Sequence, residues 1–397
     1  MSDADWESEF LKYKSSPEFA MLNSRMTLEE FKNIYWMEWI HRLWGRVIGV
    51  TFLLPAIYFT ARRGMTARMT ATVWGIGGLI GFQGFLGWWM VKSGLKDDLF
   101  APGSTPRVSQ YRLTAHLGAA FVVYLSMLWN GLTVVRDNKL INGMTPKDAA
   151  ASFKGFLDPR LRHFRIATFG LLALTFTTAM SGALVAGLDA GLIYNEFPYM
   201  GLGLTPPKSE LFDSFYSHVP ANDKGTHSDL VWRNMFENPS LVQLDHRIMA
   251  TTTFTAIVAL FAWTRFSGKL VKALPPSAKK AAHGVLGFAS LQVILGISTL
   301  LYLVPTTLAS AHQAGALALL TWTTVMASRV HMSKSSLRLL ESRLKARGLG
   351  NPNLAKKQRA EAAQRIQQAT SKNPPGQRWK TAKRTIDLDQ AKPAVSA

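Results

Sequence analysis

Four histidines lie at matched places of an internal repeat. Two of them are followed by arginine and open long apolar segments, as His41-Arg42 and His246-Arg247. The other two, His116 and His312, open a later apolar segment of each half. A single histidine in an apolar helix usually forms hydrogen bonds between helices. Four at matched positions indicate ligands instead, and the repeat itself decides the fold class.

The residue types limit what these histidines can bind. The chain has no cysteine, so thiolate metal sites and cysteine nucleophiles are excluded. We expect two pairs, His41 with His116 and His246 with His312, each clamping one planar group inside a helical bundle. Imidazoles from two facing helices hold haem iron in this way, whereas zinc needs more ligands than one pair offers. Interhelical hydrogen bonding is the alternative role.

The two halves differ at one position that matters for chemistry. Glu38 lies three residues before His41, and the matched position in the second half is Gln243. Positions three apart share a helix face, so Glu38 could point into the first pocket and transfer a proton there. The second pocket, with an amide, is suited to holding a cofactor. Alternatively, Glu38 lies near an open helix start, where the helix dipole favours acids.

Arginine follows the first histidine of each pair. Arg42 and Arg247 could reach the propionates of a haem at the membrane interface, or they could extend to lipid phosphates. The sequence favours neither role. An intervening apolar segment of each half holds a Gln-x-x-x-Gly pattern, Gln83 to Gly87 and Gln292 to Gly296.

Long apolar runs position these residues. Runs of about 20 residues are long enough to cross a bilayer core of roughly 30 Å. We predict an all-α integral membrane protein with two pseudo-symmetric transmembrane helix bundles, and place the four histidines in the first turn of their helices, at one depth. The predicted spans are 42–60, 73–92, 112–135, 163–187, 246–266, 280–303 and 309–330.

The charge distribution predicts the orientation. A net charge of +20 would suggest nucleic acid as the partner of a soluble protein, but the Lys and Arg residues fall in alternate loops and in the C-terminal tail. Basic loops stay in the compartment of synthesis, which places them in the mitochondrial matrix or the bacterial cytoplasm. We therefore expect contact with lipid and no nucleic acid. The first forty residues match neither a signal peptide nor an acid-poor presequence.

The chain divides into five expected parts. They are a polar, interfacial segment at 1–40, an incomplete first half-bundle at 41–135, a basic loop at 136–162, a second four-helix bundle at 163–330, and a basic tail at 331–397. The stretch 188–245 is long and aromatic and should pack as a cap. The tail is expected to be helical to about residue 370 and disordered beyond, with its charge facing anionic lipid.

A helix, 163–187, precedes the His-Arg helix of the second half, and no such helix precedes that of the first. If the repeat arose by duplication of a four-helix unit, a further helix is expected before residue 1. The alternative is that residues 1–40 replaced it.

Several motifs together resemble the haem A synthase family in its mitochondrial and alphaproteobacterial form. The likeness runs from about residue 7 to 331. The motifs are Glu38-x-x-His41-Arg42-x-Trp44-Gly45-Arg46, His116-Leu117-Gly118, the run from Gly182 to Gly191 with Tyr194-Asn195-x-Phe197-Pro198, Gln243-x-Asp245-His246-Arg247, and His312-Gln313.

The resemblance implies eight helices in the mitochondrial inner membrane, or alternatively a bacterial plasma membrane, and oxidation of the C8 methyl of haem O to the formyl of haem A for cytochrome c oxidase. It implies haem b on His246 and His312, the substrate haem near His41 and His116, and Glu38 as the catalytic carboxylate. A ferredoxin-type or other electron donor is implied. Haem O synthase, oxidase assembly factors and a second copy of the chain are further partners to consider.

This sequence departs from the family in one respect. The family's first helix, with its Gly-Gly-Leu-Thr-Arg-type segment, has no counterpart here, so we expect haem b binding by the second half and leave activity open. Two other functions fit the same histidines. A di-haem cytochrome b that passes electrons would not need Glu38, and a non-catalytic haem carrier would form no formyl haem.

Overall fold

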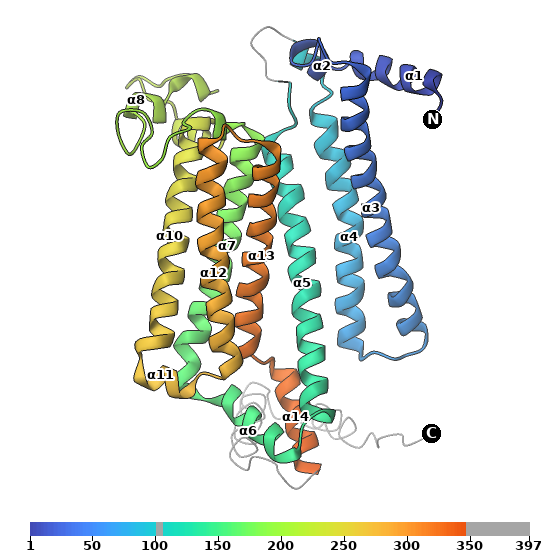
Figure 1. The fold of residues 1–397 in the computed structure, drawn as a ribbon, viewed down its shortest axis with the longest axis vertical. Coiled ribbons are helices and arrows are strands. Elements are labelled where there is room, and N and C mark those ends of the chain that lie inside the picture. The colour runs from blue at the N-terminus through green and yellow to red at the C-terminus, as the bar shows by residue number, and fades with distance from the viewer. Residues whose placement is uncertain (101–105, 347–397) are drawn as a thin grey trace, which may run out of the picture. The chain divides into compact units, whose positions relative to one another are not determined.

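The computed structural model describes residues 1–100 and 106–346. Its regular structure is helical, apart from one isolated β-bridge between Met200 and Gly203. Each of the seven predicted spans is a helix (Figure 1). These helices are α3 (Leu28–Ala61), α4 (Ala67–Ser93), α5 (Gln110–Asn142), α7 (Arg162–Gly187), α10 (Pro239–Phe266), α12 (Pro276–Leu301) and α13 (Thr306–Val330).

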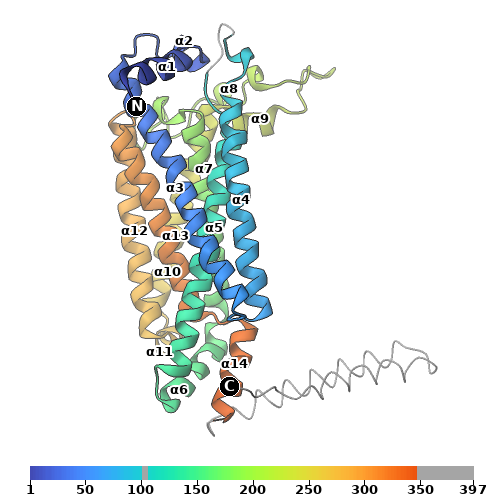
Figure 2. The same ribbon diagram turned by 90° about the vertical axis from the view of Figure 1, so that its right-hand side faces the viewer.

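Six of these helices are both long and apolar enough to cross a membrane. The seventh, α13, has 25 residues and is less apolar because Gln313 and several threonines interrupt its run. It lies beside α12 along its length in both views (Figures 1 and 2). The prediction of an all-α integral membrane protein is confirmed.

The helix starts explain where the histidines lie. A capping box at Thr27 and Glu30 starts α3, because each side chain bonds the backbone N–H of the other residue. As a result His41 lies more than three turns inside α3. His116, His246 and His312 lie roughly two turns inside their helices. Our expectation that all four lie in a first turn was therefore wrong.

The second half forms a bundle of α7, α10, α12 and α13 around one apolar core. Phe164, Ile257, Val285 and Met326, one from each helix, are almost completely buried in it. Helix α5 joins this bundle, since the Tyr124 hydroxyl and Thr321 Oγ1 lie 2.8 Å apart. The first-half helices bury less, with 6% of the most apolar stretch of α3 buried in the protein against 22% for α7 and α10. The first half therefore presents more apolar surface to its surroundings.

Short helices cover the ends of α3 and α10. Near the N-terminus, α1 (Asp3–Lys14) and α2 (Pro17–Met21) pack an aromatic cluster against the start of α3, with Trp6, Phe10 and Phe31 buried. The stretch after α7 contains η3 (Ala190–Leu192), α8 (Lys208–Leu211), η4 (Ser214–Tyr216) and α9 (Leu230–Glu237). We call residues 188–238 the cap. Helix α10 begins at Pro239, earlier than predicted, because Asn238 caps it.

The remaining elements are short. They are η1 (Asp97–Phe100), α6 (Pro146–Leu157), η2 (Pro159–Leu161), α11 (Gly268–Ala273) and α14 (Lys334–Ala346). The stretch 136–162, predicted to be a loop, contains the end of α5 as well as α6 and η2. Residues 137–154 and 333–346 belong to a unit separate from the rest. Of the predicted tail, residues 331–346 are described and contain α14, so the expected helical part from 347 to about 370 and the expected disordered end lie outside the described residues.

Candidate functional site

The first pair of histidines faces each other from two helices. The ring centroids of His41 on α3 and His116 on α5 are 6.4 Å apart, and the ring planes meet at 77°. A metal–imidazole bond is about 2 Å long and a ring centre lies about 1 Å beyond its nitrogen, so two imidazoles on opposite sides of one metal have centroids about 6 Å apart. The observed separation would allow both rings to bind one metal.

The glutamines of the Gln-x-x-x-Gly patterns support the histidine backbones. Gln83 donates from Nε2 to the carbonyl of His116 over 2.8 Å. Gln292 makes the same bond to His312 over 2.7 Å. Both link the middle helix of a half to the helix that carries a candidate ligand. The two halves that repeat in sequence therefore also share the same glutamine-to-histidine hydrogen bond.

Glycines give the histidine rings room. A Cβ atom placed on each of three glycines would lie 2.9 to 3.1 Å from the Cε1 atom of a histidine ring. Such a distance is too short for an ordinary contact, so an alanine would push the ring away. The three pairs are Gly87 with His116, Gly182 with His246, and Gly296 with His312. The Cε1 atom of each of these rings therefore packs closely against the backbone of a neighbouring helix.

His246 has an additional polar contact. Its Nδ1 lies 2.8 Å from Oγ of Ser181, which precedes the glycine on α7. By contrast, Nδ1 of His116 and Nδ1 of His312 are buried without a hydrogen-bond partner. Buried polar atoms are normally paired, and an unpaired one marks a place where a further group is expected.

These donors fit haem better than zinc. In the described part of the chain, no group of three or more His, Cys, Asp or Glu side chains is close enough to hold a metal ion. A pair of imidazoles suits a metal whose other ligands come with a planar cofactor. The glycines let the Cε1 edge of each ring approach the backbone of a neighbouring helix, which suits imidazoles that hold a group inside a helical bundle.

Glu38 and Gln243, the matched residues of the two halves, have different partners. Glu38 forms an ion pair with Arg42, one turn along α3, and both side chains are more than half exposed. Gln243 is almost completely buried and donates to the carbonyl of Ala190 over 2.7 Å. The amide of the second half thus holds the start of the cap, whereas the acid of the first half pairs within its own helix.

Arg247 also holds the cap. Its guanidinium donates to the carbonyls of Tyr194 and Glu196 over 3.0 and 2.9 Å, and to those of Tyr199 and Pro198 over 3.1 and 3.4 Å. Its Nε is buried without a partner. The planar fork of arginine suits several carbonyls at once. The segment 194–199 is therefore fixed directly to the turn of α10 that carries His246.

Asn195 is a further residue that holds the cap, and this role was not predicted from the sequence. Its Nδ2 donates to the carbonyls of Gly191 and Leu300 over 2.8 and 3.0 Å, tying the cap to the end of α12. Asp189, which has a left-handed backbone at φ 48°, forms an ion pair with Arg107 at 2.8 Å. Asn195 and Asp189 both belong to the motif between Gly182 and Pro198. The sequence therefore showed that these residues belong to a motif, but it did not show which residues they contact.

Burial and hydrogen bonds inside the cap shift the pKa values of two of its side chains, Tyr194 and Asp229. Burial and a 2.6 Å hydrogen bond to Glu210 raise the pKa of Tyr194 to about 12, so the phenol stays neutral. Burial would raise the pKa of Asp229, but bonds from Ser217, the His218 N–H and Arg233 outweigh it and lower the pKa to about 2. The cap therefore folds around an ionised aspartate.

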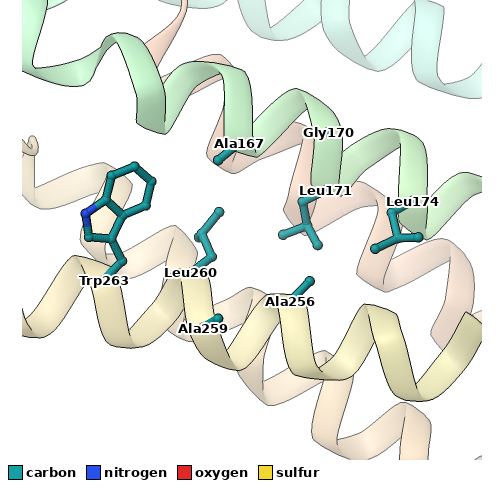
Figure 3. Close-up of a pocket in the computed structure, with 8 residues that line it drawn as sticks. All are labelled: Ala167, Gly170, Leu171, Leu174, Ala256, Ala259, Leu260 and Trp263. Atoms are coloured by element: carbon teal, nitrogen blue, oxygen red, sulfur yellow. The ribbon is translucent and has the colours of Figure 1, made fainter.

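An open apolar pocket of about 490 Å³ lies between α7 and α10, and no histidine lines it (Figure 3). Its walls carry no titratable side chain, so it offers no groups for chemistry. The lining residues are Ala167, Gly170, Leu171, Leu174, Ala256, Ala259, Leu260 and Trp263.

Comparisons with known proteins show related sequences over most of this chain. A family model described as cytochrome oxidase assembly protein matches residues 1–324. The chain is 48% identical over 339 residues to a haem A synthase of Saccharomyces cerevisiae, covering 85% of this chain and 68% of that protein. It is 45% identical over 320 residues to a human haem A synthase, covering 81% and 69%.

One relative carries a further domain. The chain is 45% identical over 334 residues to a haem A synthase–mitochondrial ferredoxin fusion protein of Schizosaccharomyces pombe, covering 83% of this chain and 53% of that protein. The chain thus spans about half the length of the fusion protein.

Proposed function

This chain belongs to the cytochrome oxidase assembly protein family, whose members include haem A synthases, and from that premise we propose a division of labour between its two histidine pairs. The protein is an oxidoreductase that converts haem O to haem A, and it is a multi-pass protein of the mitochondrial inner membrane. In this proposal His246 and His312 hold a resident haem b, and His41 with His116 receives the substrate haem.

The facing rings of His41 and His116 carry the proposal. They come from α3 and α5, and their separation of 6.4 Å suits two ligands of one iron. The second pair has the same glutamine and glycine supports, which favours the same kind of ligand. It has in addition the hydrogen bond between His246 and Ser181 and the buried attachment of Gln243 to the cap. These extra supports favour a resident group at the second pair and an exchanging one at the first.

Glu38 is the acid–base group of the proposed substrate site. It lies one turn before His41 on α3, and Arg42 holds its carboxylate in an ion pair. A carboxylate held there can take up a proton released as the substrate is oxidised, and Arg42 compensates its charge in the resting state. Haem bound to the second pair would supply one-electron redox chemistry. The corresponding amide, Gln243, cannot move a proton and serves to hold the cap.

A ferredoxin-type protein is the proposed electron donor. The support is the S. pombe relative, whose name describes a haem A synthase fused to a mitochondrial ferredoxin. The predicted orientation places the basic loops in the matrix.

The proposal is tested with single alanine variants of the four histidines in the purified chain. We expect His246→Ala or His312→Ala to remove the low-spin haem spectrum. His41→Ala or His116→Ala should spare much of that spectrum but stop conversion of haem O, followed by product mass. His283→Ala is the matched control, because this ring bonds only the Lys279 carbonyl of its own helix and contacts Phe261. Equal spectral loss in all four variants would refute the division of labour.

Glu38→Gln tests the catalytic role separately. The amide keeps the shape of the side chain but cannot accept a proton at neutral pH. We expect retained haem spectra with conversion of haem O lowered by on the order of a hundredfold or more. Conversion at the unaltered rate would remove Glu38 from the chemistry while leaving the haem sites in place.

A further inference from the structure

We infer that Ser181 is a positioning residue that fixes His246 in one tautomer and presents its Nε2 as the metal-binding atom. The inference rests on the proposed function, since it assumes a haem on His246. It concerns a contact between α7 and α10 to which the family motifs assign no role.

The hydrogen bonds of Ser181 determine which way its proton points. Oγ lies 2.8 Å from the carbonyl of Thr178, one turn earlier on α7, and 2.8 Å from Nδ1 of His246. A carbonyl can only accept, so the single hydroxyl proton is donated to Thr178. Towards His246 the hydroxyl oxygen can then only accept a hydrogen bond. Nδ1 of His246 must therefore carry the proton.

The tautomer decides how the ring can bind a metal. A neutral imidazole with a proton on Nδ1 has its free electron pair on Nε2, and only a nitrogen with a free pair can be a ligand. A hydrogen bond to the opposite nitrogen also orients the ring and makes the ligand more basic. Gly182, the next residue, removes the side chain that would otherwise displace the ring. Ser181 and Gly182, two successive residues of α7, thus fix the position of the His246 ring.

The same stretch of α7 is fixed to α10 at a second point. Oγ1 of Thr178 lies 2.7 Å from Oγ1 of Thr253, two turns after His246. This contact holds in place the very carbonyl to which Ser181 donates. The acceptor for His246 is therefore attached at both ends, once through the Thr178 backbone and once through the threonine pair.

His246 differs in this respect from two other candidate ligands. Nδ1 of His116 and of His312 is buried without a protein partner, so no contact within the described chain sets their tautomer. Because a more basic ligand stabilises ferric iron, the hydrogen bond that His246 Nδ1 donates to Ser181 would lower the reduction potential of a haem held by His246.

The test is a redox titration of the purified full chain, with the optical spectrum and low-temperature electron paramagnetic resonance of its low-spin haem. We expect Ser181→Ala to keep the haem, to shift its midpoint potential to a more positive value, and to change its g-values. Ser181→Thr retains the hydroxyl and should restore both to near the wild-type values. Ser328→Ala is the control, because Ser328 likewise donates to the carbonyl three residues before it, that of Val325, without a histidine contact.

The outcomes separate this inference from the proposed function. A wild-type potential and wild-type g-values in Ser181→Ala would overturn the inference alone. Loss of haem in Ser181→Ala with retention in Ser181→Thr supports the inference, because threonine keeps the hydroxyl that alanine lacks. Loss in both variants overturns it, because the residue would then act through its volume. A haem spectrum that survives His246→Ala unchanged would overturn the proposed function itself.

Discussion

Gln292 and His312 are joined by a hydrogen bond of 2.7 Å from the side-chain amide to the backbone carbonyl. The same bond joins the matched residues of the first half over 2.8 Å. A glutamine in the middle helix of each half thus holds the helix that carries a candidate ligand. The glutamine of each Gln-x-x-x-Gly pattern, which the sequence shows only as a spacing, is therefore the donor of this hydrogen bond.

Replacing Gln292 by leucine should loosen the resident haem. The change leaves the His312 carbonyl with one partner fewer and costs about 1 kcal/mol. We expect haem to leave the purified variant several-fold faster, measured as transfer to an excess of a haem-binding acceptor protein. Gln313→Leu, an exposed neighbour of His312, is the control. Equal rates in the two variants would show that the bond does not hold the ligand helix.

Gly296→Ala should displace the ring of His312. The new methyl group would lie 2.9 Å from Cε1, and overpacking of this kind costs about 1–3 kcal/mol. Gly287→Ala on the same helix has open space around the added atom and should keep the haem. The measured quantity is haem per protein after purification. A normal haem content in Gly296→Ala would mean that the ring has room to move.

The first half allows the same comparison. Gly87→Ala would place a methyl group 3.0 Å from the His116 ring, whereas Gly84→Ala meets nothing within 4 Å. If His116 binds the substrate haem, Gly87→Ala should lower conversion of haem O and leave the resident spectrum intact. A loss of the resident spectrum would place the two haems differently from the proposal.

Arg247→Lys should release the segment 194–199. Lysine keeps the charge but cannot serve four carbonyls at once, and losing two hydrogen bonds costs about 2 kcal/mol. Limited proteolysis in detergent should cut the cap on the order of ten times faster. Arg265→Lys, an exposed change at the far end of α10, should leave the rate unaltered. An unchanged rate in Arg247→Lys would show that other contacts suffice to hold the cap.

Asp229 should make the fold sensitive to acid. Its pKa is about 2 in the folded protein, below the ordinary value of 3.8, so folding favours the ionised form. The stabilisation is present above about pH 4 and is lost as the pH falls towards 2. Thermal unfolding of the wild type should therefore drop across this window. Asp229→Asn should unfold at a lower temperature near neutral pH and show a smaller drop on acidification.

The fold was largely predictable because apolar runs of membrane length are a strong signal. The seven helices and the capping box at Thr27 follow from local residue types. The start of α10 was less predictable, because Asn238 begins this helix well before its apolar run. A polar first turn is invisible to a search for hydrophobic spans.

The candidate site was predictable in its members but not in its contacts. Repeat position singled out the histidines, and the rings of His41 and His116 do face each other. The partners of Arg247 and the bond between Ser181 and His246 were not expected. These contacts join residues about fifty or more positions apart, and their geometry depends on how helices pack, which periodicity does not report. A serine beside a glycine in a helix has no sequence signature of its own.

The first turns of α10 both hold the cap and carry the candidate ligand His246. Asn238, Gln243 and Arg247 make contacts with the cap, and His246 lies among them. The cap and the candidate ligand therefore share the same turns of one helix, so a cap that has not folded leaves the turn carrying His246 without the contacts of Gln243 and Arg247. Stable seating of a group on His246 is then tied to the folding of a segment that does not itself contact the ring.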